Sequence, residues 1–435
     1  MPLSKTSEIV IVGGGAFGLS TALHLTQAGF TNISIYEQDD QIPPRYSAAN
    51  DLNKIVRAEY EDPFWTELTI QAIAAWKTPF FAPHFHQTGF IHCVSKDAPE
   101  EASATLNRFR VAADAHPEMK DHVEPFTKDG DIQKRFWQYQ GSFPGWTGYF
   151  NGYDGYAHSG NALASAYRAA QASGVRFFLG SQGSVSRIVY GTASGGRKAT
   201  GIELADGQVR SADLVIVAVG AAATKLVPEI GTQVVAKSWS VAHVHLSDEE
   251  VSALRGIPIT YARDLGFYFE PDPKTNLLKI CPMGGGYVNT DPKTGFSHAP
   301  TNLYDSAFVP AHDEAKMRKL LADTLPYLAD RPLVRKSLCW FADTQNSDFI
   351  IDYVPGTSES LVLLTGDSGH GFKFFPIFGT WVKALLEKGE QSITRLQWKD
   401  PNASAKDKNW GGAVSWRLGE TKEFAEIRPA PKSRI

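Results

Sequence analysis

Residues 8–18, close to the start of the chain, read EIVIVGGGAFG. The short, continuous apolar run at 9–12 is typical of a strand buried on both faces of a parallel sheet. The glycines that follow match the pattern GxGxxG, and apolar residues at helical spacing continue to Thr26, with Gly29 as a plausible stop. We therefore predict a strand, a tight turn and a helix, in that order.

A second apolar run at 33–36 ends in an acid, Glu37, at the spacing of a dinucleotide-binding unit. In such a unit Gly13 permits the tight turn, and Gly15 lets the backbone approach a pyrophosphate at the helix N-terminus. Gly18 allows the helix to pack closely on the strand, and Glu37 accepts ribose hydroxyls. The pattern alone fits FAD or NAD and disfavours NADP. A glycine-rich turn in some other α/β protein is the alternative.

Composition narrows the classes of function. The 435 residues carry 43 Lys and Arg against 47 Asp and Glu, so a general basic surface for nucleic acid is not expected. The apolar runs fall short of the roughly 20 residues that span a bilayer, so no membrane span is expected. Three separated cysteines, without zinc-type spacing, predict neither a disulfide framework nor a metal site and favour a reducing intracellular compartment. The ending Ser433-Arg434-Ile435 loosely matches a peroxisomal address, otherwise a cytoplasmic location is expected.

Further buried strands are predicted at 212–220 and 361–366, a hairpin at 206–210, and helices at 68–76, 162–171 and around 381–386. The region 234–287 alternates as antiparallel strands do. We expect an α/β nucleotide-binding domain assembled from 1–60, 150–225 and 335–400. A substrate domain of α+β type would take 61–149 and 226–334, and a tail of surface or loosely ordered chain would take 401–435.

Two further motifs are GDSGHGFK at 366–373 and LCWFADT at 338–344. With the opening segment they make the chain resemble the FAD-dependent amine oxidases that include monomeric sarcosine oxidase, pipecolate oxidase, fungal saccharopine oxidase and the fructosyl amino acid oxidases (amadoriases). The resemblance extends from about residue 8 to about residue 400. It implies a Rossmann domain of the glutathione-reductase type and a second, substrate domain built on an antiparallel sheet.

The resemblance also implies a role for individual residues. It implies that FAD is attached covalently through Cys339, which residue chemistry alone would more often place in a core as a small hydrophobe. It implies that Lys279 stabilises charge on O2 as it is reduced; an ordinary surface lysine is the alternative. The cofactor contacts implied are Gly13, Gly15, Ala16, Phe17, Gly18, Glu37, Ser47, Lys54, Val185, Gly220, Cys339, Asp367, Gly369, Gly371, Phe372 and Lys373.

For the substrate, the resemblance implies that Lys373 and Arg57 hold a carboxylate, and the planar fork of Arg suits that contact. The alternative for Arg57 is a surface ion pair with Glu59 or Asp62. Met283 stands where the fructosyl amino acid oxidases have a Glu that holds sugar hydroxyls, and a thioether accepts hydrogen bonds poorly.

We therefore expect a monomeric oxidase that acts on the secondary amine of saccharopine, pipecolate or an N-alkyl amino acid. Hydride passes to FAD, O2 is reduced to H2O2 and the imine hydrolyses. The alternatives are a fructosyl amino acid oxidase with an altered pocket, a flavoprotein of secondary metabolism acting on an amino-acid-derived amine or binding without turnover, and an NAD-linked dehydrogenase.

Overall fold

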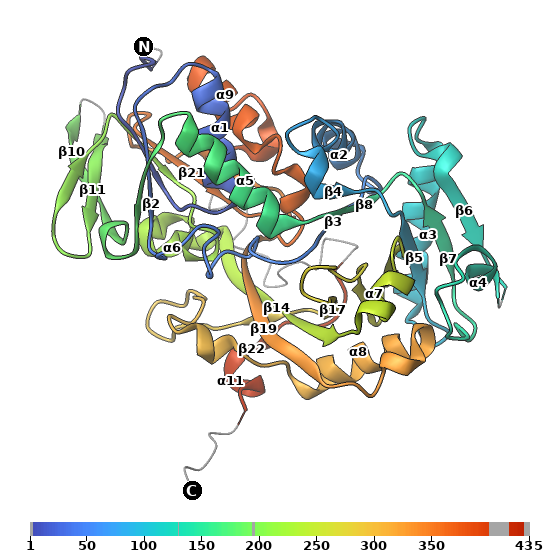
Figure 1. The fold of residues 1–435 in the computed structure, drawn as a ribbon. Coiled ribbons are helices and arrows are strands. Elements are labelled where there is room, and N and C mark those ends of the chain that lie inside the picture. Colours follow the sequence, from blue (N-terminus) through green and yellow to red (C-terminus); the bar gives the residue numbers. More distant parts are fainter. Residues whose placement is uncertain (1–2, 129, 194–195, 400–416, 430–435) are drawn as a thin grey trace, which may run out of the picture.

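The computed structural model describes residues 3–128, 130–193, 196–399 and 417–429. Figure 1 shows helices α1, α5 and α9 gathered around one sheet near the N-terminus, and the long strands β14 and β19 in another part of the molecule. The two sheets therefore form separate layers that the chain visits more than once.

The first sheet has six strands in the order β20-β21-β13-β1-β2-β9. Its strands are β1 (Ile9–Val12), β2 (Ile33–Glu37), β9 (Arg176–Leu179), β13 (Leu214–Val217), β20 (Ile350–Tyr353) and β21 (Leu361–Thr365). All neighbouring pairs are parallel except β20 with β21. The predicted strands at 9–12, 33–36, 212–220 and 361–366 are confirmed. They lie in one sheet although they are far apart in the sequence.

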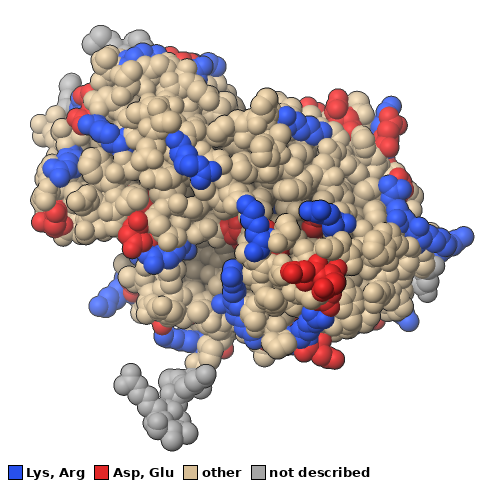
Figure 2. Space-filling model, in the orientation of Figure 1, with Lys and Arg blue, Asp and Glu red and all other residues tan. Residues whose placement is uncertain are grey.

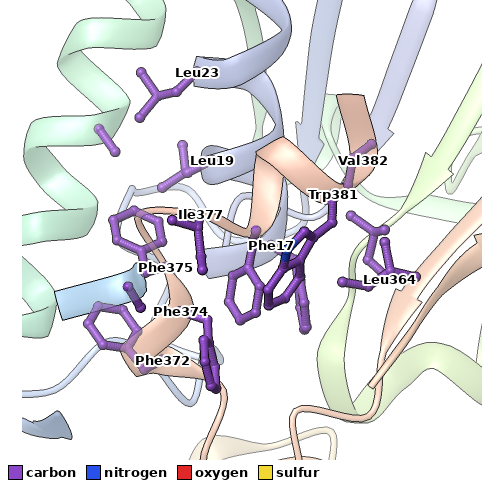
Figure 3. Close-up of a cluster of buried hydrophobic side chains, with 14 of the residues drawn as sticks. Phe17, Leu19, Leu23, Leu364, Phe372, Phe374, Phe375, Ile377, Trp381 and Val382 are labelled. Carbon is purple, nitrogen blue, oxygen red and sulfur yellow. The ribbon is translucent and has the colours of Figure 1, made fainter. Parts of the chain in front are cut away.

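Four helices pack around this sheet: α1 (Ala16–Gln27), α2 (Pro63–Trp76), α5 (Ser159–Ala172) and α9 (Phe378–Lys388). Figure 3 shows Phe17 of α1 beside Trp381 of α9, with Phe374 of the segment that precedes α9 below them. The rings of Phe17 and Phe378 lie 4.2 Å apart, centroid to centroid. Burial of these aromatic side chains holds the segment at 366–378 against the helix that follows the glycine-rich turn.

The second sheet has ten strands, of which nine follow the order β22-β18-β14-β17-β16-β15-β5-β7-β6, while β19 pairs with the other edge of β14. The strands are β5 (Phe90–Val94), β6 (Val123–Phe126), β7 (Thr147–Asn151), β14 (Val234–His245), β15 (Ile259–Ala262), β16 (Gly266–Tyr268), β17 (Leu277–Pro282), β18 (Tyr287–Val288), β19 (Leu333–Thr344) and β22 (Lys422–Glu423). The predicted antiparallel pairing is confirmed for most of the sheet. Two pairs, β5 with β15 and β18 with β22, are parallel because their strands come from distant segments rather than from hairpins.

Smaller elements complete the fold. Two further three-stranded sheets consist of β10 (Val185–Ala193), β11 (Gly196–Leu204) and β12 (Val209–Ser211), and of β3 (Lys54–Val56), β4 (Phe85–His86) and β8 (Gly155–Ala157). The remaining α-helices among the described residues are α3 (Glu100–Ala115), α4 (Asp131–Arg135), α6 (Ala223–Leu226), α7 (Asp248–Ala253), α8 (Ala311–Thr324) and α11 (Phe424–Ile427). The predicted hairpin at 206–210 joins β11 to β12.

Part of the predicted tail packs on the second sheet. Strand β22 pairs with β18, and the Thr421 hydroxyl donates to the Gly285 carbonyl at 3.0 Å. The rest of the tail, including Ser433-Arg434-Ile435, lies outside the described residues. Across the described part of the chain, no helix has both the length and the hydropathy to cross a membrane.

Gly18 provides a test of this packing. A Cβ on Gly18 would lie 2.0 Å from the Gly13 carbonyl oxygen, so Gly18→Ala must push α1 away from the turn. We expect a loss of about 1–3 kcal/mol of stability, measured by thermal or urea unfolding. Gly191→Ala is the control, because its Cβ would meet only the methyl group of exposed Thr200, at 3.2 Å. Equal stability of the two variants would contradict the packing argument.

Candidate active site

A large cavity lies where the two sheets meet, with a volume of about 2220 Å³ that includes its opening to solvent. Figure 2 shows a hollow between the upper and lower parts of this face of the molecule, with Lys and Arg side chains on its rim. One wall consists of the segments that follow the carboxyl ends of β1, β2, β13 and β21. Ligands of open parallel sheets bind at that edge.

The glycine-rich turn forms one end of the cavity. Gly13 has φ +109°, a conformation that side-chain-bearing residues rarely adopt. Helix α1 begins after Gly15 with neither a side-chain cap nor an acid in its first turn, so its N-terminal amides face the cavity. Glu37 accepts hydrogen bonds from the amides of Gly14 and Asp39, at 2.8 and 2.9 Å. Burial raises the pKa of Glu37 more than these hydrogen bonds lower it.

The structure brings nearly all of the predicted site residues to this one cavity. The residues that line it are Gly13, Gly15, Ala16, Phe17, Glu37, Ser47, Lys54, Arg57, Val185, Gly220, Lys279, Cys339, Asp367, Gly369, Gly371, Phe372 and Lys373. Gly18 is outside the lining and contacts the turn from behind. Asp367 accepts from the Ala342 amide at 3.1 Å, and burial raises the pKa of its carboxyl group to about 6.

Side chains alternate along a strand, and this explains which residues of the second sheet line the cavity. In β14, Trp239 lies opposite Cys339 and His243 lies opposite Lys279. Because alternate side chains share a face of a sheet, Cys339 and Lys279 project to the same side from the two strands that flank β14. The other members of this face are Val241, Tyr261, Phe267, Phe269, Cys281 and Phe341. The floor of the cavity is therefore aromatic and apolar, apart from one amine and two thiols.

Cys339 faces the cavity and is partly exposed within it. Enclosure by the protein raises the pKa of its thiol, and the Lys54 ammonium acts in the opposite direction. Its Sγ lies 3.7 Å from the Ala48 carbonyl oxygen. The side chain therefore differs from a core cysteine in one respect that matters for chemistry: its sulfur borders open space next to a cation.

Lys279 is buried, contrary to the alternative of a surface lysine, and its amine is 2.5 Å from the Asp51 carboxylate. Lys54 pairs with the same carboxylate oxygen at 3.0 Å, and Lys279 also donates to the Asn53 carbonyl at 2.7 Å. Burial alone would raise the pKa of Asp51, but the two ammonium groups outweigh burial and hold it well below its usual range. One carboxylate thus pairs with two ammonium groups at the cavity wall.

Arg57 is also buried, so a surface ion pair with Glu59 or Asp62 does not form. Its guanidinium lies 4.8 Å from the ring centroids of both Tyr60 and Phe109, and it donates to the Glu59 backbone carbonyl. Asp62 pairs instead with Arg395. The rings fix the plane of the guanidinium while one edge faces the cavity.

Lys373 also contacts Tyr60. Its amine is 4.5 Å from the Tyr60 ring centroid and donates to the Tyr60 hydroxyl at 2.5 Å. The ring nitrogen Nε2 of His370 faces the Ser347 carbonyl at 2.9 Å and must donate there, so Nδ1 accepts from the Tyr60 hydroxyl at 2.8 Å. Burial, followed by the charge of Arg57, lowers the pKa of Lys373 well below its ordinary value. Two basic groups therefore converge on one tyrosine at this end of the cavity.

Met283 lines the cavity beside an aromatic cluster that includes Tyr261 and Phe269. Its backbone carbonyl accepts from the Lys316 amine at 2.7 Å. Its side chain presents a thioether rather than a carboxylate, so this part of the wall offers no strong acceptor for a sugar hydroxyl.

Sequence reasoning missed several residues of this site. Asp51 precedes Lys54 by three positions, and that spacing could have indicated an ion pair. Tyr60 and His370 gave no local signal, because their roles depend on contacts between segments 310 positions apart. Arg417 belongs to the segment read as a tail, yet it lines the cavity and pairs with buried Asp343.

The residues present fit FAD. A Cβ on Gly15 would lie 3.2 Å from the Ser47 hydroxyl, so the missing side chain leaves room between the helix N-terminus and Ser47. The uncapped amides of α1 suit a pyrophosphate, and the Glu37 carboxyl group lies where ribose hydroxyls are bound in such units. The apolar floor next to Cys339 suits a flat aromatic ring.

Comparison with known proteins agrees with this geometry. A sequence model described as FAD dependent oxidoreductase (DAO) matches residues 8–385. The L-saccharopine oxidase of Schizosaccharomyces pombe is 30% identical, covering 98% of this chain and 96% of that protein. The N-methyl-L-tryptophan oxidase of Salmonella agona is 26% identical over 86% of this chain and 92% of its own length. The crystal structure of fructosamine oxidase (Amadoriase II) from Aspergillus fumigatus is similar with a TM-score of 0.87, at 30% identity, and covers 100% of this chain and 99% of that one.

Replacement of Asp51 tests the charge balance. Asp51→Asn leaves two ammonium groups without their carboxylate, and we expect a loss of about 3 kcal/mol at neutral pH. Because the folded-state pKa of Asp51 is depressed, its contribution is present above the unfolded pKa of about 4 and declines as the pH falls further, toward the folded pKa. Urea unfolding of both proteins from neutral pH downward should show the difference narrowing only below that value.

The control is Asp114→Asn, which removes a more exposed partner of Arg110 and should change stability by less than about 0.5 kcal/mol. A difference between wild type and Asp51→Asn that stays constant down to the lowest pH would contradict an ionised Asp51.

Proposed function

Because the chain belongs to the family of FAD-dependent oxidoreductases, we propose that it oxidises the secondary amine of an N-substituted or cyclic amino acid, of the saccharopine, pipecolate or N-alkyl amino acid type. The observation that carries the proposal is the meeting of Arg57 and Lys373 at Tyr60, in the same cavity as Cys339 and Lys279. A carboxylate receptor and a cofactor-sized space thus share one enclosure.

FAD bound here would accept a hydride from the carbon next to the substrate nitrogen and pass the electrons to O2, giving H2O2. The turn at Gly13–Phe17 and Glu37 would hold its nucleotide end, and the segment at 366–373 would border its ring. We propose that Cys339 tethers the ring covalently, because its sulfur borders the cavity beside a cation. Lys279 is proposed to stabilise negative charge on O2, since its amine is fixed by Asp51 at the same wall.

The protein's own contribution is positioning and electrostatics. Arg57 and Lys373 would bind the carboxylate of the substrate. The enclosing rings of Tyr261, Phe267 and Phe269 exclude water, which favours the neutral form of the amine that can release hydride. The imine product would then leave and hydrolyse in solution.

A fructosyl amino acid oxidase is the second candidate, favoured by the structural likeness to Amadoriase II. The thioether of Met283 argues against it, because the wall lacks a carboxylate acceptor for the sugar at that position. A flavoenzyme of secondary metabolism that acts on another amino-acid-derived amine would use the same carboxylate receptor.

We also propose a discontinuous FAD-binding domain at 1–60, 150–225 and 335–400, with a substrate domain at 61–149 and 226–334. The protein is proposed to be a monomer inside the cell, in the peroxisome if Ser433-Arg434-Ile435 is read as an address and otherwise in the cytoplasm. Strand β19 carries Cys339 and pairs with β14 within the second sheet, so the boundary near 335 falls inside a strand of that sheet.

A panel of amines tests the substrate class. Peroxide release from L-saccharopine, L-pipecolate and N-methyl amino acids should exceed release from fructosyl-glycine and fructosyl-valine by at least about 100-fold in kcat/KM for the preferred compound, because a buried polar group without a partner costs about that much. Preference for a fructosyl amine would overturn the first proposal in favour of the second. Absence of flavin, with nicotinamide-dependent turnover, would overturn both.

Covalent attachment has its own test. After acid precipitation of the wild-type protein, the yellow colour should stay in the pellet, and in Cys339→Ala it should move to the supernatant. Cys281→Ala is the matched control, because Cys281 is a second thiol lining the same cavity. Colour that is retained in Cys339→Ala, or lost in Cys281→Ala, would reject Cys339 as the attachment site.

A further inference from the structure

A buried polar network lies directly behind Arg57, outside the cavity lining. Its members have at most 1% of their surface exposed, and they are Glu59, His92, Tyr149, Asn151 and Asp154. They come from the chain after β3, from β5, from β7 and from the turn after β7. So many polar side chains in one dry place need a specific arrangement of protons.

The two acids share a proton. The Asn151 amide nitrogen donates to Glu59 Oε2 and to Asp154 Oδ2, at 3.1 Å in each case. Both groups are buried and contact the same amide nitrogen, so they are close neighbours in a water-free place. Two ionised carboxylates this close repel each other strongly, so one of them carries a proton and the pair holds a single negative charge.

The other contacts decide which acid is ionised. The Tyr149 hydroxyl donates to Glu59 Oε1 at 3.4 Å, and His92 Nδ1 lies 3.0 Å from that hydroxyl and 3.5 Å from Oε1. Arg263 donates to His92 Nε2 at 3.3 Å, so the ring proton of neutral His92 is on Nδ1, the side of Glu59. Burial lowers the pKa of His92 to about 3, which keeps it neutral. Glu59 is therefore surrounded by donors.

Asp154 accepts two hydrogen bonds, from the Ala58 amide to its Oδ1 at 2.8 Å and from Asn151 to its Oδ2 at 3.1 Å, and it also faces the negative charge of Glu59. Burial, and then that charge, raise the pKa of Asp154 well above its usual range. For Glu59, the hydrogen bonds and the charge of Arg57 outweigh burial and lower the pKa. Glu59 is the anion, and Asp154 is the neutral acid.

This anion is coupled to the proposed carboxylate receptor in two ways. The backbone carbonyl of Glu59 accepts from Arg57, and the charge of the Glu59 side chain attracts the Arg57 guanidinium. Arg263 supplies a second guanidinium, which donates to His92, and Lys373 is a third basic group whose pKa burial lowers. The two guanidinium groups together carry more charge than Glu59, which leaves an excess for an arriving carboxylate.

We propose that Glu59 is a positioning residue and the fixed counter-charge of the carboxylate receptor, with Asp154 as the proton-bearing acid that holds it; the inference rests on the proposed role of Arg57. Glu59 keeps Arg57 in place when the cavity is free of carboxylate. Its charge also opposes the incoming carboxylate, so binding is weaker than the cations alone would give. Substrate and product both carry that carboxylate, and this opposition lets the product leave.

The experiment measures binding of propionate, a carboxylate without an amine, to the flavin-loaded protein by the change in the flavin absorbance. Glu59→Gln keeps the shape and removes the charge. We expect propionate to bind about tenfold more tightly, because a nearby buried charge that opposes it has gone. The acid limb of the kcat profile should move about one pH unit lower, since a less negative site disfavours a protonated amine.

Glu59→Asp is the conservative variant, and it provides a second test of whether the charge of Glu59 sets propionate affinity. It keeps the charge but shortens the side chain, so propionate affinity should stay within about threefold of wild type. If the role of Glu59 were only structural, Glu59→Gln would change propionate affinity less than Glu59→Asp does, because Gln has the same shape as Glu and Asp is shorter. That order, or unchanged propionate affinity in Glu59→Gln, overturns the proposal.

Asp154→Asn tests the position of the proton. An amide replaces a carboxyl group that is already neutral, so propionate affinity should change by less than about twofold. A tenfold tightening would place the negative charge on Asp154 instead. Asp323→Asn, a change at a buried acid that pairs with Lys319 outside the cavity, controls for loss of stability alone.

Arg57→Met distinguishes a failure of the proposed carboxylate receptor from a failure of the proposed role of Glu59. If Arg57 receives the carboxylate, this variant should weaken propionate binding by at least about tenfold. Unchanged binding in Arg57→Met rejects the proposed receptor itself. Weakened binding in Arg57→Met, together with an unresponsive Glu59→Gln, keeps the receptor and rejects only the role of Glu59.

Discussion

The balance of buried charge between Asp51 and the ammonium groups of Lys54 and Lys279 joins the two layers of this protein. Asp51 and Lys54 belong to a segment close to the first sheet, whereas Lys279 is on β17 of the second. Ions taken out of water cost several kcal/mol each unless partners replace the solvent, so neither layer can hold its share of these charges alone. The contact therefore fixes the position of one sheet relative to the other.

That relative position creates the cavity. Parallel strands end at one edge of the first sheet, and the aromatic side of the second sheet lies across from them. The first sheet supplies amides and an acid suited to the polar part of a dinucleotide. The second supplies flat apolar surface, a thiol and an amine. A cofactor with a charged end and an aromatic end is thus accommodated between two layers of different chemistry.

At the other end of the cavity, too, protein groups replace the water around buried basic side chains. Arg57 is enclosed by Tyr60 and Phe109 and anchored by the backbone of Glu59, and Lys373 is anchored by Tyr60. These basic groups remain buried because aromatic rings, an anion and a hydroxyl replace their water. At one wall Asp51 neutralises part of the charge of two ammonium groups, and at this end positive charge is left for a ligand.

The sequence alone determined the strands, the glycine turn, the helix after it and the family resemblance, because alternating or continuous apolar runs and turn residues act over a few positions. It also indicated Cys339, Lys279, Lys373 and Arg57 as candidates, through motifs. Only the tertiary structure decided whether those cations were buried or exposed. The Lys279 amine is fixed by a segment 226 positions away, and a local pattern does not report which surface covers a strand. The proton shared by Glu59 and Asp154 could not be predicted from the sequence for the same reason, since it depends on four segments that meet in one water-free place.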